Sequence, residues 1–115
     1  MTTSDSGAPG GAPSDFRISV TDDGDVTVVA VAGELDVATA PSLREELYRV
    51  IDRGVPKVCV DLADMDFIDS TGLGVLVGAL KRVKEREGVL ELRSLPPSAQ
   101  RVFEITGLTQ AFTIT

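Results

Sequence analysis

Residues 56–92 carry the pattern that most restricts the fold of this chain. The continuous apolar run Val58-Cys59-Val60 is typical of a strand covered on both faces. A helical stretch follows from about residue 71 to 87, with apolar residues at spacings of three and four, and residues 89–92 form a second short strand. The apolar helical residues are Leu73, Leu76, Val77, Leu80 and Val83. This order predicts a right-handed βαβ unit with parallel strands.

A hairpin and a helix are predicted before this unit. Residues 16–21 alternate between apolar and polar side chains, an acidic turn occupies 22–25, and the more apolar run 26–32 predicts a second, more central strand. A helix is expected from about Thr39, a possible cap, to Asp52, with Gly54 as its stop. Its expected buried residues are Leu43, Leu47, Val50 and Ile51.

The C-terminal part predicts a third helix and an edge strand. Ser98 is the expected cap of the helix, Gly107 ends it, and residues 111–115 can add a strand at the edge. The expected apolar side of this helix consists of Val102, Phe103 and Ile105. The predicted fold class is therefore α/β: one domain over residues 15–115, with a four- to five-stranded mixed sheet and three to four helices. Residues 1–14, rich in Gly, Pro and small residues, are predicted to be a disordered tail.

The composition excludes several classes of protein. A chain of 115 residues with 43% hydrophobic side chains is long enough to bury one core. The formal charge of −7 argues against a nucleic-acid partner, because phosphate binding needs clustered Lys and Arg, and it favours a partner with a basic surface. Without a long apolar run or an N-terminal signal, we expect a cytoplasmic protein with no membrane partner.

The reactive side chains narrow the chemistry further. The absence of His removes Ser-His-Asp and Cys-His catalysis and most zinc sites. The single cysteine, Cys59, lies in a predicted buried strand and is expected to be an inert core thiol. Ser70 has neither a G-x-S-x-G flank nor a His base, so it is not predicted to be a nucleophile.

The segment 61–74 is the candidate site. Four carboxylates, Asp61, Asp64, Asp66 and Asp69, predict an acidic turn after the strand, and the helix then begins through Ser70, Thr71 and Gly72. Asp69, Ser70 and Thr71 are all candidate caps, because each offers an oxygen to the unpaired N–H groups of the first turn. Gly72 and Gly74 leave the backbone there without side-chain bulk, so another group or another protein can approach closely.

Two ligand interpretations of this segment remain open beside a solvated acidic turn. A calcium loop does not fit, because counting from Asp64 the required Gly and Glu positions hold Asp69 and Val75. A looser Mg²⁺ site with two Asp ligands is an alternative, although we predict no metal. The free N–H groups at the helix start could also hold a nucleotide phosphate, but the phosphate-binding glycine motifs are absent and the Asp residues repel an anion.

Three motifs resemble a known family, the anti-sigma-factor antagonists within the sulfate-transporter and anti-sigma-factor-antagonist (STAS) domains. They are Gly33-Glu34-Leu35-Asp36, then Phe67-Ile68-Asp69-Ser70-Thr71-Gly72-Leu73-Gly74-Val75, and Phe103-Glu104-Ile105-Thr106-Gly107-Leu108. The resemblance covers about residues 16–115.

The resemblance implies a partner-switching cycle rather than an enzyme. In that family the serine at the position of Ser70 is phosphorylated by a partner that is both anti-sigma factor and serine kinase, and a PP2C-type phosphatase removes the phosphate. The unphosphorylated antagonist binds the anti-sigma factor and frees the sigma factor, as in bacterial stress responses. The family places Asp36 near the phosphoacceptor and the helix after Ser70 in the docking face. No cofactor is implied for the antagonist, since ATP and Mg²⁺ belong to the kinase.

Other functions would share the fold. A STAS module that is never phosphorylated could serve a transporter or sensory complex, and a STAS protein could bind a small ligand or nucleotide. We expect a monomer or a weak dimer. The candidate site residues are therefore Ser70 for phosphorylation, with Asp36, Asp69, Thr71, Gly72, Leu73 and Gly74 around it.

Overall fold

The computed structural model describes residues 16–115 and contains a five-stranded sheet with three α-helices. The elements are β1 (Arg17–Asp23), β2 (Val26–Leu35), α1 (Ala40–Asp52), β3 (Lys57–Ile68), α2 (Ser70–Glu85), β4 (Val89–Arg93), α3 (Pro97–Thr106), the 3₁₀ turn η2 (Leu108–Gln110) and β5 (Thr113–Ile114). The strand order is β1-β2-β3-β4-β5, with β1 and β2 antiparallel and the other neighbours parallel. This confirms the predicted fold class. The predicted tail, 1–14, lies outside the described residues.

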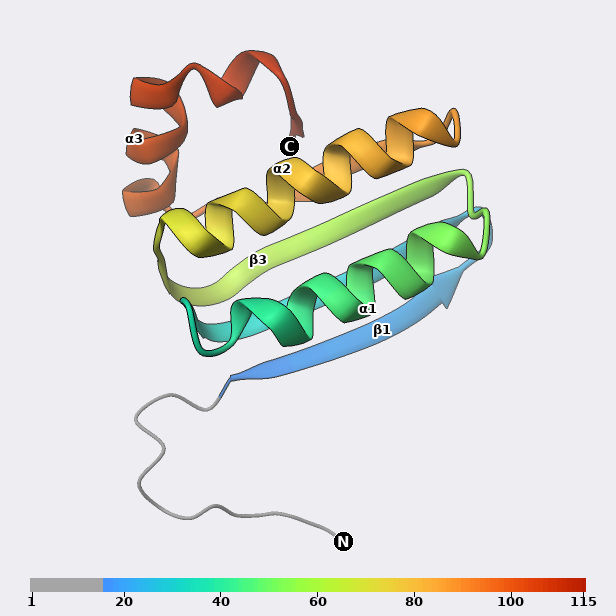
Figure 1. Ribbon diagram of the computed structural model, residues 1–115, viewed down its shortest axis with the longest axis horizontal. Coiled ribbons are helices and arrows are strands. Elements are labelled where there is room, and N and C mark those ends of the chain that lie inside the picture. The colour runs from blue at the N-terminus through green and yellow to red at the C-terminus, as the bar shows by residue number, and fades with distance from the viewer. Residues whose placement is uncertain (1–15) are drawn as a thin grey trace, which may run out of the picture.

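Helices α1 and α2 lie side by side over one face of the sheet, and α3 lies at one end of it (Figure 1). Alternate residues of β2 face these helices and are buried, among them Val29, Val31 and Leu35. The four predicted apolar residues of α1 are all buried. In α2 the buried set also includes Val75 and Ala79, which the spacing did not single out, whereas Leu73 and Val77 are only partly buried.

The sequence predicts this strand over residues 56–62, but β3 is longer, and the acidic turn expected after Leu62 is wrong. The strand runs to Ile68 and stays paired with β2, where Glu34 lies opposite Phe67 and Leu35 opposite Ile68. Two β-bulges make this possible: β3 carries one extra residue between the pairs Ala30–Asp61 and Ala32–Asp64, and another, Asp66, between Gly33–Met65 and Glu34–Phe67.

The bulges reset which side chains face the core. Because side chains alternate along a strand, each extra residue reverses the phase of those that follow. The first extra residue turns Met65 toward the helices and Asp64 away from them. The second, Asp66, restores the original phase, so Ile68 lies on the helix side, as Val60 does, and Phe67 on the other side. Simple alternation is lost over this segment, so no strand pattern marks it, and its carboxylates led to the prediction of a turn.

Some local expectations need correction. Pro96 rather than Ser98 precedes α3, and no side chain caps that helix; Ile105 is exposed instead of facing the core. Thr39 occupies the N-cap position of α1 without a cap bond, since its hydroxyl donates to the Glu34 carbonyl oxygen. Phe103 is fully buried and stacks obliquely on Phe112, with 5.5 Å between ring centroids.

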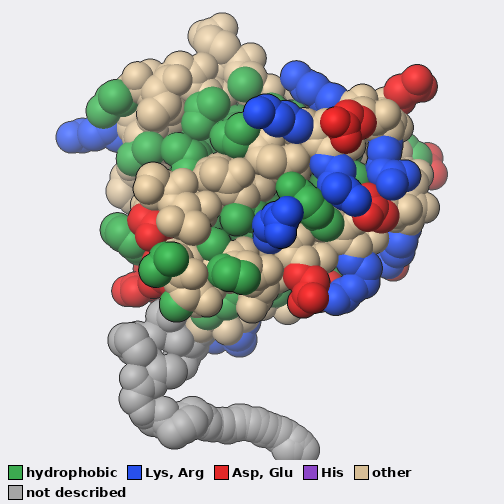
Figure 2. Space-filling view, in the orientation of Figure 1, with side chains coloured by type: hydrophobic (Ala, Val, Ile, Leu, Met, Phe, Trp, Pro, Cys, Tyr) green, Lys and Arg blue, Asp and Glu red, His purple; other side chains and the backbone are tan. Residues whose placement is uncertain are grey.

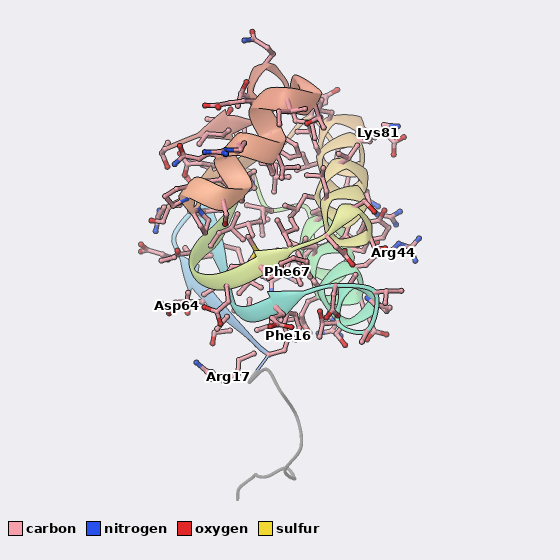
Figure 3. The ribbon with its side chains drawn as sticks, turned by 90° about the vertical axis from the view of Figure 1, so that its left-hand side faces the viewer. Phe16, Arg17, Arg44, Asp64, Phe67 and Lys81 are labelled. Atoms are coloured by element: carbon pink, nitrogen blue, oxygen red, sulfur yellow. The ribbon has the colours of Figure 1, made fainter. Side chains whose placement is uncertain are left out.

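The fold brings the end of β2, the end of β3 and the start of α2 to one edge. The Asp69 N–H donates to the Leu35 carbonyl oxygen at 3.1 Å, so the entry to α2 is tied to the end of β2. Figure 3 looks onto this edge. We call residues 34–37 and 66–74 together the Ser70 edge.

Candidate functional site

Asp69 is the residue that caps α2. Its backbone is extended, and its Oδ1 accepts a hydrogen bond from the Gly72 N–H at 2.9 Å. Its carbonyl oxygen accepts from the Leu73 N–H at 2.9 Å, the first bond of the helix. Of the three candidate caps in the sequence, the structure therefore selects Asp69, and the hydroxyls of Ser70 and Thr71 are not used for this purpose.

Ser70 is the first residue of α2, and both Ser70 and Thr71 are exposed. Within residues 16–115, no hydrogen bond holds the Ser70 hydroxyl. The side chain therefore lies open to an approaching enzyme, at a helix terminus whose N–H groups and dipole favour a negative charge.

The two glycines after Ser70 have different environments. A Cβ on Gly72 would lie 2.6 Å from Leu35 Cγ and 3.0 Å from the Leu35 carbonyl oxygen, so this glycine lets α2 start against the end of β2. A Cβ on Gly74 would meet nothing within 4 Å, and Gly74 is exposed. The predicted close approach at Gly72 is thus made by Leu35, and Gly74 keeps the outer surface free of bulk.

Asp36 organises the turn between β2 and α1. Its Oδ1 accepts hydrogen bonds from the N–H groups of Ala38 at 2.9 Å and Thr39 at 3.1 Å, while its own N–H donates to Thr39 Oγ1 at 2.9 Å. Since Leu35 accepts from Asp69, the fold places Asp36 on the Ser70 edge. The Asp36 side chain therefore has a structural role that the motif alone did not indicate.

The carboxylates of the Ser70 edge form no salt bridges with cations of the described part of the chain. The salt bridges found there involve none of Glu34, Asp36, Asp66 and Asp69. No group of three or more His, Cys, Asp or Glu side chains suited to a metal ion occurs within residues 16–115. The edge thus carries four carboxylates that take part in no ion pair within residues 16–115.

Positive charge gathers elsewhere. Figure 2 shows Lys and Arg side chains over the C-terminal halves of α1 and α2. There Arg82 forms a two-pronged ion pair with Asp52, with both N–O distances at 2.8 Å, and it stacks on the Tyr48 ring at 4.5 Å. The Arg82 guanidinium lowers the pKa of Asp52 below its usual range, and the pKa of Arg82 is raised in return.

A groove of about 800 Å³ lies between α1 and α2 and reaches Thr71.

Two exposed apolar residues of the Ser70 edge were not among the candidate site residues of the sequence. Phe67 is 49% exposed and Val37 is 70% exposed. Phe67 belonged to the family motif, but its segment was predicted to be a turn, and only a strand gives this residue a fixed outer face. Cys59, in contrast, is buried as expected, and burial raises the pKa of its thiol.

A comparison with known proteins decides the family. The model of the STAS domain matches residues 17–115. The chain belongs to the STAS domain family. This confirms the resemblance seen in the sequence motifs, and it covers every element of the sheet from β1 to β5.

Several relatives of this STAS domain carry a functional name. An anti-sigma-B factor antagonist of Bacillus subtilis (strain 168) is 47% identical over 81 residues, which cover 70% of this chain and 72% of that protein. One from Listeria monocytogenes is 43% identical over 88 residues, 75% of each chain. The crystal structure of an anti-sigma factor antagonist from Mycobacterium paratuberculosis superposes with a TM-score of 0.81 at 30% identity, covering 90% of this chain and 87% of that one.

None of the helices within residues 16–115 is long and apolar enough to cross a membrane.

Proposed function

We propose that this STAS domain is an anti-sigma-factor antagonist controlled by phosphorylation of Ser70. In its unphosphorylated form it binds an anti-sigma factor that is also a serine kinase, and the sigma factor is released. The kinase transfers the γ-phosphoryl group of ATP to the Ser70 hydroxyl oxygen, ADP leaves, and the hydroxyl proton is lost to solvent. A PP2C-type phosphatase hydrolyses the phosphate and restores binding.

The observation that carries this proposal is that Asp69, and not Ser70, caps the helix. Asp69 caps the helix, so the exposed Ser70 hydroxyl can be modified without loss of a structural hydrogen bond. A phosphate there is also tolerated by the fold, because free N–H groups and the helix dipole stabilise an anion at a helix N-terminus. The effect of phosphorylation is therefore local.

Charge and bulk explain why docking would be lost. Phosphorylation adds about −1.5 to −2 charges and three acceptor oxygens to a surface that already carries Glu34, Asp36, Asp66 and Asp69. The phosphate also stands beside Gly74, where the surface is free of bulk and a partner can come close. A loss of roughly 3 to 4 kcal/mol would weaken binding several hundredfold, enough for a switch.

Phosphoryl transfer with purified proteins tests the proposal. The chain is incubated with the anti-sigma factor of its host and Mg-ATP, and the product is mapped by intact-mass and tandem mass spectrometry. One phosphate on Ser70 is expected, removed by the host's PP2C-type phosphatase. Ser70→Ala should abolish the mass increase. Ser98→Ala, which alters another exposed serine in the first turn of a helix, should not.

Two results would contradict the proposal. A phosphate that maps elsewhere would remove Ser70 from the cycle. Binding to the anti-sigma factor without any phosphoryl transfer would favour a STAS module that is not switched in this way. Since the cycle uses ATP and a sigma factor, we assign it to the cytoplasm.

A further inference from the structure

Phe67 is an exposed aromatic side chain whose position depends on a bulge. The first bulge of β3 reverses the alternation, so that Met65 faces the helices, and the extra residue Asp66 reverses it again. Without this second reversal, Phe67 would point toward the helices and Ile68 away from them. With it, Ile68 packs against the core and Phe67 lies opposite Glu34, on the outer side, 49% exposed. Bulges often re-aim a side chain next to a functional site. The outward orientation of Phe67 is therefore built into the backbone.

The surroundings fix the backbone at Phe67. On one side its strand neighbour Ile68 packs on the core, and the next residue, Asp69, is bonded to the Leu35 carbonyl oxygen. The pairing with Glu34 fixes the strand itself. An aromatic ring on a rigid strand end loses little conformational freedom on binding, which is a property of residues that dominate interfaces.

Phe67 also lies on the same edge of the molecule as Ser70. Phe67 is three residues before Ser70, and Figure 3 shows it near the middle of the Ser70 edge. Val37, 70% exposed, lies on the same edge in the turn that Asp36 holds. The other large exposed apolar residues of the described chain, Val20, Val89 and Ile105, lie outside this edge.

Charge indicates the chemistry of the partner. Glu34, opposite Phe67, and the adjacent Asp66 lack ion pairs with cations of the described chain, as do Asp36 and Asp69. An apolar ring beside carboxylates that form no ion pair is complementary to an apolar pocket with a basic rim.

We propose that Phe67 is the apolar anchor of the Ser70 edge and enters a pocket on the anti-sigma factor that is lined by apolar residues and rimmed by Lys and Arg. This rests on the proposed function and names the contact that gives the complex its affinity. Ser70 then lies beside the anchor, where a phosphate would oppose entry of the ring.

Calorimetric titration with the host's purified anti-sigma factor tests the anchor. Phe67→Ala should raise the Kd about tenfold or more, the range of an interface hot spot, while Phe67→Leu should stay within about threefold of the wild type. The matched control is Val89→Ala: Val89 is 45% exposed but begins β4, at the opposite end of the parallel strands, so the Kd should change less than about twofold. The wild-type Kd should rise between about 0.05 and 0.5 M NaCl, because salt screens the charged rim.

The outcomes separate the two proposals. If the wild type binds and Ser70→Asp does not, but Phe67→Ala binds as tightly as Val89→Ala, the anchor is refuted and the proposed function stands. If the wild type does not bind the anti-sigma factor, both are overturned. Should Phe67→Ala lower the melting temperature, Phe67→Gln, which keeps much of the bulk but is polar, provides the same comparison. A Kd independent of salt would refute the basic rim.

Discussion

Leu35 occupies the space beside Gly72 so closely that a Cβ on the glycine would lie 2.6 Å from Leu35 Cγ. Leu35 is fully buried, and its carbonyl oxygen also accepts the hydrogen bond from Asp69. One residue of β2 therefore sets both the distance and the position at which α2 begins.

Replacing Gly72 tests that contact. We expect Gly72→Ala to lower the free energy of unfolding by about 1–3 kcal/mol, because the methyl group overpacks against Leu35 and its backbone. Gly74→Ala is the control, since its Cβ meets open space, and it should raise stability by up to about 1 kcal/mol through helix propensity. Urea denaturation measures both. Equal stability of the two variants would show that the start of α2 shifts at little cost.

Two variants separate the structural role of the Asp36 side chain from its electrostatic role. Asp36→Ala removes the acceptor for Ala38 and Thr39 and should cost about 1 kcal/mol, typical of a lost cap, or about 4–8 °C in melting temperature. Asp36→Asn keeps a carbonyl acceptor but not the charge, so its melting temperature should stay close to that of the wild type. Anti-sigma binding by Asp36→Asn then reports the charge alone. If both variants melt alike, the turn does not need this acceptor.

Substitutions at Ser70 should imitate the two states of the switch. We expect Ser70→Ala to bind the anti-sigma factor like the wild type and to be constitutively active, because no structural hydrogen bond is lost. Ser70→Asp should bind poorly, since it adds charge to an acidic edge. Both variants should melt near the wild type, as the site is exposed. Equal affinities in calorimetry would contradict this prediction.

The Asp52–Arg82 pair makes a specific contribution to acid sensitivity. The pKa of Asp52 in the folded protein is lowered, mainly by the hydrogen bond from Arg82. The pair therefore stabilises the fold at pH values above the usual Asp pKa of about 3.9. This contribution is lost as the pH falls through the lowered value. The difference in melting temperature between the wild type and Asp52→Asn should therefore shrink below about pH 4, from a size that solvent screening keeps small.

A control on the same helix separates this pair from general acid denaturation. Glu45 is exposed and takes part in none of the salt bridges of the described chain, so Glu45→Gln should differ little from the wild type at any pH. A difference for Asp52→Asn that does not change with pH would show that packing, not charge, makes the contribution.

Element order and the position of the phosphoacceptor candidate could be predicted from the sequence. Helix periodicity, capping residues and the run Val58-Cys59-Val60 are local patterns, and local patterns fix which segments become helices or strands. Cys59 and the apolar face of α1 were placed correctly for the same reason. The same local patterns were wrong at Ser98, which does not cap α3, and at Ile105, which is exposed, because packing of the helix against the rest of the fold decides both.

What the sequence determined by itself is the βαβ framework and a hydroxyl-bearing helix start after an acidic segment. Only the tertiary structure decided that this segment is a bulged strand, that Asp69 rather than Ser70 caps α2, and that Phe67 points outward. The physical reason is that pairing with β2 sets the register of residues 63–68. Hydrogen bonds between two strands do not produce a periodic pattern of apolar residues in the sequence of either strand.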